Sequence, residues 1–223
     1  MKKITYFFTK YFIRTVFLPF LHIDYQQLSS LVGNGPKIFA ANHPSTLDPI
    51  FIMSILKTTV SILLTQSVFY LPIIGLILKK TGHIPVADGQ GSLAYQKAKD
   101  KLIEGQSILI FPEGHLSEQD GSTKPFFSGA IRLAMETKAP IVPLGISIQT
   151  NRVKTKQIKI KNKIDQARFY LRGKYVLTIG KQLSLTGNTT NKHKIDGNKN
   201  KLMLAINQLI AESHTRLTNY RRS

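Results

Sequence analysis

The sequence predicts an α/β fold, in which a mostly parallel, mixed central sheet is flanked by helices in a single domain. Three observations lead to this prediction. Short apolar runs that suit buried strands alternate with longer segments of helical pattern between residues 36 and 146. Gly and Pro separate these runs. The 223 residues, 42% of them hydrophobic, suffice for one core, and we find no internal repeat and no second core.

Residues 1–30 are predicted to be a helical segment that lies on a membrane, ahead of a domain at residues 31–223. Its aromatic and basic residues recur at helical spacings: Lys3, Phe8, Lys10, Tyr11, Phe12 and Arg14. This combination is typical of an amphipathic helix at the membrane interface. Lys10 and Arg14 interrupt the apolar run and so disfavour a helix that spans the membrane. A secretory signal peptide is disfavoured because no small-residue cleavage site follows the apolar part. The alternative is a helix buried in a soluble protein.

Strand and helix patterns then alternate through the middle of the chain. A turn-rich stretch at 28–35 leads to a strand at 37–40 and to a helix that begins near Asp48, with Pro49 as its first residue. The next predicted elements are a strand at 59–64, a buried helix or loop at 68–78, a short strand at 83–86, a helix at 92–104, a strand at 107–111, a helix at 130–138 and a strand at 140–146.

Beyond residue 150 the pattern becomes more polar. We predict an edge strand or exposed loop at 154–161 and a strand at 175–180. A polar stretch at 187–200, rich in Asn and Lys, is predicted to be a mobile loop. Leu202 and Ile206 recur at helical spacing within 202–217, which predicts a terminal helix.

The charge of the chain is strongly positive. Its 31 Lys and Arg residues against 12 Asp and Glu give a net charge of +19, and residues 151–223 hold 17 of the basic and 3 of the acidic ones. Such a balance indicates a polyanionic partner, either an anionic membrane surface or nucleic acid. Nucleic acid is the less favoured partner, because the basic segments carry few aromatics and no known nucleic-acid motif. A compositional bias toward Lys and Asn is the simplest alternative source of the charge.

The absence of Cys bounds the chemistry. It excludes disulfides, thiol nucleophiles and Cys-ligated metals, and we expect no metal site. No Gly-x-Ser-x-Gly elbow indicates a serine hydrolase, and no Gly-rich loop followed by Lys indicates use of a nucleoside triphosphate.

The turn after the strand at 37–40 carries the first candidate catalytic residues. It reads Asn-His-Pro-Ser-Thr-Leu-Asp from Asn42 to Asp48. If the next helix begins at Asp48, its carboxylate lies near the imidazole of His43 and holds one ring nitrogen while the other faces a substrate. Such a His–Asp pair serves as a general base for a hydroxyl group. Asn42 and Ser45 shape the turn and are candidate substrate-binding residues. Taken alone, the turn also fits a His and an Asp that merely cap a helix.

A second group of polar residues follows the strand at 107–111. It consists of Glu113, Gly114 and His115, all candidate substrate-binding residues. Because active residues gather at the carboxyl ends of the strands in α/β sheets, we expect this group to lie beside His43. His83 precedes a strand and is interpreted as a structural histidine.

Several of these segments together resemble the PlsC-like glycerolipid acyltransferase family, also known as 1-acylglycerol-3-phosphate O-acyltransferases. Asn42–Asp48 resembles the His-x4-Asp motif of that family, and the stretch 111–117 resembles its Phe-Pro-Glu-Gly-Thr-Arg-Ser block. Weaker blocks lie in family order at 82–86, 126–130 and 139–144. The resemblance covers roughly residues 36–182.

The resemblance implies an O-acyltransferase of phospholipid biosynthesis, with residues 31–223 as the acyltransferase domain. Acyl-CoA or acyl-carrier protein is the implied donor, and a lysolipid, most simply 1-acylglycerol-3-phosphate, is the implied acceptor. No cofactor, metal or covalent acyl-enzyme is implied. His43 is the implied general base and Asp48 its partner, and Glu113 and Gly114 line the acceptor site. The expected location is the cytoplasmic face of a membrane, as a peripheral or monotopic protein.

Two departures from the family pattern concern the acceptor's phosphate. The family commonly has Arg at the position of Leu116 and near that of Asp88, and Arg is the usual bidentate partner of a phosphate. The missing arginines leave two readings open. Another cation replaces them, for which the candidates are Lys79, Lys80, Lys124 and Arg132, or the acceptor is a lyso-amino-lipid without that phosphate. A membrane-bound esterase that uses water as acceptor is a further alternative.

Overall fold

The computed structural model describes residues 2–16, 18–27, 34–118, 121–161 and 163–219. Within these ranges seven strands form one central sheet, whose spatial order is β1 (Leu21–Gln27), β9 (Gly173–Ile179), β6 (Ile141–Ile148), β2 (Ile38–Ala41), β5 (Ser107–Ile110), β3 (Val60–Thr65) and β4 (Ile84–Val86). β9 runs antiparallel to β6 and parallel to β1, whereas β6, β2, β5, β3 and β4 are parallel neighbours. The predicted mostly parallel, mixed sheet is therefore confirmed.

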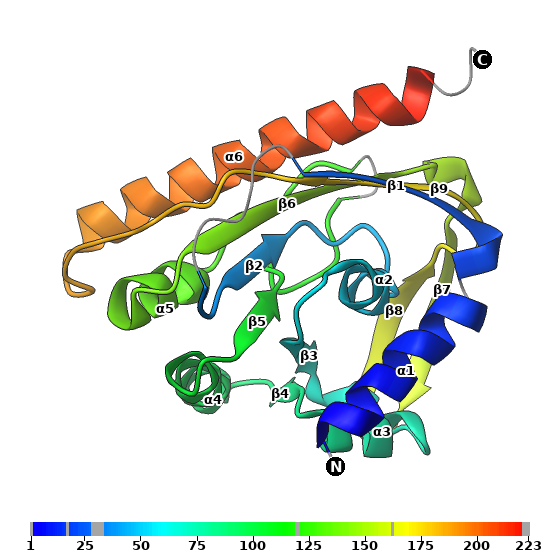
Figure 1. Ribbon diagram of the computed structural model, residues 1–223, viewed down its shortest axis with the longest axis horizontal. Helices are drawn as coiled ribbons and strands as arrows, with labels where there is room; N and C mark the ends of the chain where they lie inside the picture. Colours follow the sequence, from blue (N-terminus) through cyan, green and yellow to red (C-terminus); the bar gives the residue numbers. More distant parts are fainter. Residues whose placement is uncertain (1, 17, 28–33, 119–120, 162, 220–223) are drawn as a thin grey trace.

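Helices cover both faces of this sheet (Figure 1). They are α1 (Lys2–Val16), α2 (Asp48–Ile55), α3 (Ile74–Thr81), α4 (Gly91–Ile103), α5 (Gly129–Thr137) and α6 (Lys192–Asn219). One apolar core contains side chains of α1 and α2, and the other contains those of α4, α5 and α6. The middle strands β2, β5 and β6 are apolar almost throughout because both of their faces are covered. Their carboxyl ends, at Ala41, Ile110 and Ile148, lie on one edge of the sheet.

Two strands, β1 and β8, were not predicted. β1 lies at the edge of the sheet and pairs with β9, so the helical part of the predicted segment 1–30 ends earlier than expected. β1 lacks the apolar pattern by which a buried strand is recognised in a sequence. Its Asp24, for example, forms ion pairs with Arg216 (2.6 Å) and Lys174 (3.4 Å) instead of facing a core. The second strand, β8 (Lys163–Phe169), pairs with β7 (Lys154–Ile160) in a hairpin outside the main sheet.

The predicted mobile loop at 187–200 is wrong over its second half, because α6 begins at Lys192. Only Ile195 and Leu202 are buried in the first turns of this helix. Their spacing of seven residues places them on the same face, and polar residues between them face solvent. The predicted apolar face of 202–217 is confirmed, since Leu202 and Ile206 pack into the core.

The amino-terminal helix has two different sides. Tyr6 and Ile13 are buried, and the helix packs against α2 and α3. Its other side exposes Phe8, Tyr11 and Phe12 to solvent. None of the helices in the described ranges combines the length and the apolar character that a membrane span requires.

His83 is a buried structural histidine, and it makes the stability of the fold depend on pH. Its Nδ1 accepts a hydrogen bond from the backbone N–H of Ile62 (3.1 Å), and burial lowers its pKa from 6.5 to about 4. Between these pH values the unfolded chain binds the proton and the folded chain does not. The contribution of neutral His83 to the free energy of unfolding is therefore fully present above pH 6.5. It is lost as the pH drops toward 4, by about 3 kcal/mol in total.

Replacing His83 with Asn tests this dependence. The Asn carbonyl can accept the Ile62 hydrogen bond but does not titrate. We expect the free energy of unfolding, measured with urea between pH 7 and pH 4, to fall about 3 kcal/mol less in His83→Asn than in the wild type. Equal losses in both proteins would show that His83 is not the group that titrates.

Candidate active site

The His–Asp turn forms as predicted. Helix α2 begins at Asp48 with Pro49 in its first turn, and the chain from His43 to Leu47 folds back so that His43 Nδ1 lies 2.9 Å from Asp48 Oδ2. The same oxygen accepts the backbone N–H of Ser45 (2.7 Å). Asp48 Oδ1 accepts the hydroxyl of Tyr175, which reaches it from β9 (3.1 Å). A carboxylate held by three donors fixes the orientation of the imidazole.

Asp48 is fully buried. Burial raises its pKa above 3.8, while the hydrogen bonds from His43, Ser45 and Tyr175 counteract part of that rise. Tyr175 is fully buried as well, and burial together with the Asp48 charge raises its pKa well above the ordinary value, so it remains a hydrogen-bond donor.

His43 presents its second ring nitrogen away from this pair. Its ring stacks on that of Phe111, with centroids 4.0 Å apart and planes inclined by 20°. Because Asp48 accepts from Nδ1, the neutral ring carries its proton there and Nε2 is an acceptor. Nε2 forms no hydrogen bond to any residue that the structure describes, and the side chain is 16% exposed. The geometry is that of a general base open to a substrate.

Glu113 lies at this site, but its carboxylate faces the protein's own donors. Oε1 accepts the Ser117 hydroxyl (2.6 Å), and Oε2 accepts the backbone N–H of Lys124 (2.8 Å). Ser117 Oγ also accepts the backbone N–H of His43 (2.8 Å). Burial raises the pKa of Glu113. The carboxylate is thus joined to the His43 turn through Ser117, and its contact with a substrate stays a prediction.

The other predicted site residues divide into exposed and buried ones. Gly114 and His115 are exposed at the site's rim. Gly114 has a φ of +69°, and a Cβ there would come within 2.7 Å of the Phe127 ring, so both conformation and space favour Gly. The amide of Asn42 is buried and bonds both the N–H (2.8 Å) and the C=O (3.0 Å) of Ile146. Asn42 therefore ties the end of β2 to β6.

Ser45 connects the turn to the hairpin that was not predicted. Its hydroxyl donates to the backbone oxygen of Arg168 in β8 (3.1 Å). Thr46 adds two more bonds, from its N–H to the oxygen of Arg168 (2.8 Å) and from the N–H of Arg168 to its hydroxyl (2.9 Å). Arg168 Nη1 in turn donates to the backbone oxygen of Ser117 (2.6 Å). Ser45 is thus a buried residue that fixes the turn to β8 and to Asp48.

Ser117, Arg168 and Tyr175 are the site residues that sequence reasoning missed. Arg168 and Tyr175 follow the turn by 120 residues or more and carry no local motif. Ser117 belongs to the second family-like block and could have been found from its place in that block.

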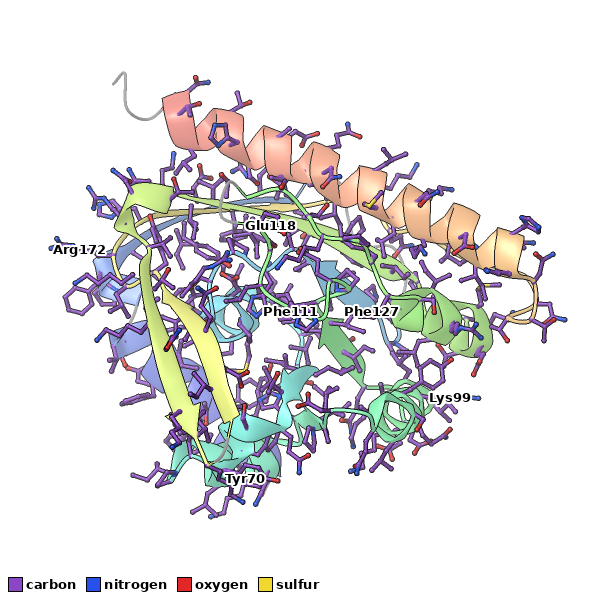
Figure 2. The ribbon with its side chains drawn as sticks, turned by 180° about the vertical axis from the view of Figure 1, so that it is seen from behind. Tyr70, Lys99, Phe111, Glu118, Phe127 and Arg172 are labelled. Atoms are coloured by element: carbon purple, nitrogen blue, oxygen red, sulfur yellow. The ribbon has the colours of Figure 1, made fainter. Side chains whose placement is uncertain are left out.

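Two openings flank this centre on the carboxyl edge of the sheet. A pocket of about 460 Å³ lies at the ends of β3 and β4 and the hairpin tip, lined among others by Thr65, Tyr70, Asp88 and Lys161. A groove of about 1060 Å³ lies at the end of β6 beside α6, lined among others by Pro44, Ser147, Asn151, Arg168, Asn207 and His214. Since β2 and β5 lie between these strands, His43 and Glu113 are placed between the two openings. In Figure 2, Phe111 is central, with Glu118 above it and Tyr70 below it.

Comparisons with known proteins identify the family of the chain. The family model described as "Acyltransferase" matches residues 22–147. A chloroplastic 1-acyl-sn-glycerol-3-phosphate acyltransferase of Brassica napus is 30% identical over 147 residues, which cover 64% of this chain and 42% of that protein. A 1-acyl-sn-glycerol-3-phosphate acyltransferase of Borreliella burgdorferi is 31% identical over 110 residues, covering 48% and 44%. The chain thus spans less than half the length of these relatives.

The crystal structure of the 1-acyl-sn-glycerophosphate acyltransferase PlsC from Thermotoga maritima has the same fold. It superposes with a TM-score of 0.70 at 18% identity, covering 95% of this chain and 80% of that one. The family model covers more than half of the chain and includes the whole of both predicted motif blocks. The chain therefore belongs to the acyltransferase family.

Proposed function

We propose that this protein transfers a fatty acyl group from a thioester donor to the free hydroxyl of a lysolipid, most directly 1-acylglycerol-3-phosphate, to give phosphatidic acid. The observation that carries the proposal is the His43–Asp48 pair, whose Nδ1–Oδ2 bond leaves Nε2 available beside two openings. The names of the relatives support this acceptor.

The pair suits a single displacement at the thioester carbonyl. Nε2 of His43 takes the proton of the acceptor hydroxyl while the hydroxyl oxygen attacks the carbonyl carbon of the thioester. The carboxylate of Asp48 stabilises the imidazolium that forms. The new C–O bond forms and the C–S bond breaks. The departing thiolate then takes the proton back from His43, so the enzyme returns to its starting state. We propose no metal, no cofactor and no acyl-enzyme in this sequence.

The donor is proposed to be acyl-CoA or acyl-carrier protein. Both carry the acyl group on the same phosphopantetheine thiol, and both are anionic. The net charge of +19 supports attraction of such donors and of anionic lipid.

A membrane surface is the proposed location of the acceptor. α1 and α3 are in contact and lie together at the end of the molecule away from α6 (Figure 1). Their outer sides expose large apolar side chains, which are Phe7, Phe8, Tyr11, Phe12, Ile74 and Leu76, with Ile73 just before α3. We name these seven residues the apolar face. Such a face supports peripheral or monotopic binding, which we place on the cytoplasmic side.

Removing two side chains of the apolar face tests the membrane proposal. Phe8 and Leu76 are 72% and 61% exposed, so the double variant Phe8→Ser, Leu76→Ser does not disturb the core. We expect binding to vesicles with anionic lipid, measured by flotation, to fall at least about tenfold, because each side chain loses apolar burial in the bilayer. Leu204→Ser is the matched control, since Leu204 is 67% exposed on α6. Equal binding by both variants would contradict the apolar face as the membrane contact.

Acyl transfer itself is tested with the wild-type protein. It is incubated with acyl-CoA or acyl-carrier protein thioester, with and without a panel of lysolipids, and the products are separated by mass. We expect a diacyl product that requires both substrates. Free fatty acid released equally with and without lysolipid would instead identify a thioesterase, and the absence of both products would overturn the proposed function.

A further inference from the structure

Arg168 is a buried cation without a counter-charge among the residues that the structure describes. It lies in β8 and is only 6% exposed. No carboxylate in the described part of the chain lies within ion-pair distance of its guanidinium. Its hydrogen bonds run from Nη1 to two backbone oxygens, those of Ser117 (2.6 Å) and Glu118 (3.4 Å). Burying an unpaired charge is costly, which suggests an anionic partner that comes from outside the chain.

Most donors of this guanidinium are unused. Nε is buried and has no partner, and no hydrogen bond joins Nη2 to a described residue. A guanidinium offers five N–H groups in a planar fork that matches two oxygens of a phosphate. Arg168 also lines the groove beside α6, so a ligand in that groove can reach it.

The position of Arg168 relates it directly to the catalytic base. Ser117 links the two side by side, because its backbone oxygen accepts from Arg168 Nη1 and its N–H donates to the backbone oxygen of His43 (2.9 Å). Pro44, the residue after His43, lines the same groove. An anion held by Arg168 in that groove therefore lies beside the turn that carries His43.

The other cations suggested by the sequence are less well placed. Lys79 and Lys80 end α3, ahead of β4, and so lie at the amino edge of the sheet. Arg132 donates to the backbone oxygen of Thr189 (3.2 Å), and Lys124 Nζ pairs with Glu118 (3.7 Å).

The second opening offers a less suitable environment for an anion. Asp88 lines the pocket at the ends of β3 and β4, whose one lysine, Lys161, lies over the Tyr70 ring (3.5 Å). Val86, Ile160 and the Tyr70 ring also line that pocket, which suits the acyl chain of a lysolipid better than its phosphate.

We propose that Arg168 binds the phosphate monoester of the acceptor and takes the place of the motif arginines that this chain lacks. The inference rests on the proposed function. In 1-acylglycerol-3-phosphate the free hydroxyl and the phosphate are on neighbouring carbons, so a phosphate on Arg168 keeps the hydroxyl close to His43. The hairpin β7–β8 then determines which acceptor is used.

The test compares acceptors with and without the phosphate. KM and kcat are measured for 1-acylglycerol-3-phosphate and for the monoacylglycerol of the same chain, using wild type, Arg168→Met, Arg168→Lys and the exposed control Arg172→Met, whose side chain projects outward in Figure 2. We expect Arg168→Met to raise KM for the phosphate acceptor roughly 10- to 100-fold, because a charge-assisted hydrogen bond is lost. KM for monoacylglycerol and for the donor should stay unchanged. Arg168→Lys should be intermediate, since it keeps the charge but not the fork.

Three outcomes would overturn the inference. An equal rise in KM for both acceptors would show that Arg168 only clamps the backbone of Ser117 and Glu118. A rise in KM for the donor alone would assign the site to a phosphate of the donor. Wild-type preference for monoacylglycerol would leave acyl transfer intact but remove the phosphate site. If Arg168→Met does not fold, Arg168→Lys carries the same comparison.

A binding measurement separates this inference from the proposed function. Titration calorimetry with short-chain 1-acylglycerol-3-phosphate needs no turnover. If the wild type transfers no acyl group yet binds this lipid, and Arg168→Met does not, the proposed function fails and the phosphate site stands. Equal binding by wild type and Arg168→Met overturns the phosphate site.

Discussion

His43→Ala is expected to lower kcat for acyl transfer by roughly 10²- to 10⁴-fold, the usual contribution of a positioned general base. The structure gives the physical reason: Nε2 is the ring nitrogen left open once Asp48 holds Nδ1, and the variant has no other group there to accept the hydroxyl proton. KM should change little, because the base acts on the reacting proton and not on the bound headgroup. Steady-state kinetics with saturating thioester measure the effect.

The matched control for this variant is His193→Ala. His193 is exposed in the first turn of α6 and lies outside the site. Its loss should leave kcat unchanged. A folded His43→Ala protein, verified by circular dichroism, that keeps wild-type kcat would refute the proposed mechanism.

Asp48→Asn should lower kcat roughly 10- to 100-fold without lowering stability at neutral pH. The Asn carbonyl oxygen can replace Oδ2, which accepts from His43 and Ser45, and its NH₂ can replace Oδ1, where the Tyr175 hydroxyl can turn to accept. The imidazole then keeps its orientation and proton position. What is lost is the negative charge that stabilises the imidazolium during the reaction.

The expected stability follows from the raised pKa of Asp48. Above 3.8 the folded wild type holds this proton more tightly than the unfolded chain does, so its stability falls as the pH rises toward the pKa of the folded state. Asn cannot ionise and avoids that loss. Both proteins share the opposite contribution of His83, so the comparison is between their curves: from pH 4 to pH 7 the free energy of unfolding, measured with urea, should rise more in Asp48→Asn than in the wild type. Lower stability of the variant at pH 7 would contradict this account, and unchanged kcat would show that the charge has no catalytic part.

Local signals explain why the geometry of the His43–Asp48 turn could be predicted. Pro44 and Pro49 disfavour one continuous helix, on which His43 and Asp48, five residues apart, would not face each other. A turn followed by a helix that begins at Asp48 brings the carboxylate back toward the imidazole. The apolar runs of β2 and β5 likewise mark buried parallel strands whose ends carry polar residues. These inferences need only neighbouring residues.

The parts that escaped prediction depend on distant partners. β8 and β1 are polar because they lie at edges, and their pairing energy comes from backbone hydrogen bonds that any sequence can form. The missed roles of Tyr175 and Arg168 follow from which distant residues their strands lie beside, which no local pattern specifies. The same reason explains why Glu113 could be placed at the site while its bonds to Ser117 and Lys124 could not.

The hydrogen bonds from β8 and β9 to the His43 turn also affect how the chain is made. Thr46 and Asp48 meet Arg168 and Tyr175 across separations of 122 and 127 residues. Contacts of such high contact order form late, because closing a long loop costs entropy before any contact compensates for it. A nascent chain synthesised only as far as residue 160 holds His43 and Asp48, the proposed catalytic pair, but not the partners that orient them. The orientation of the His43–Asp48 pair should thus be reached only in the final stage of synthesis, when the sheet is completed.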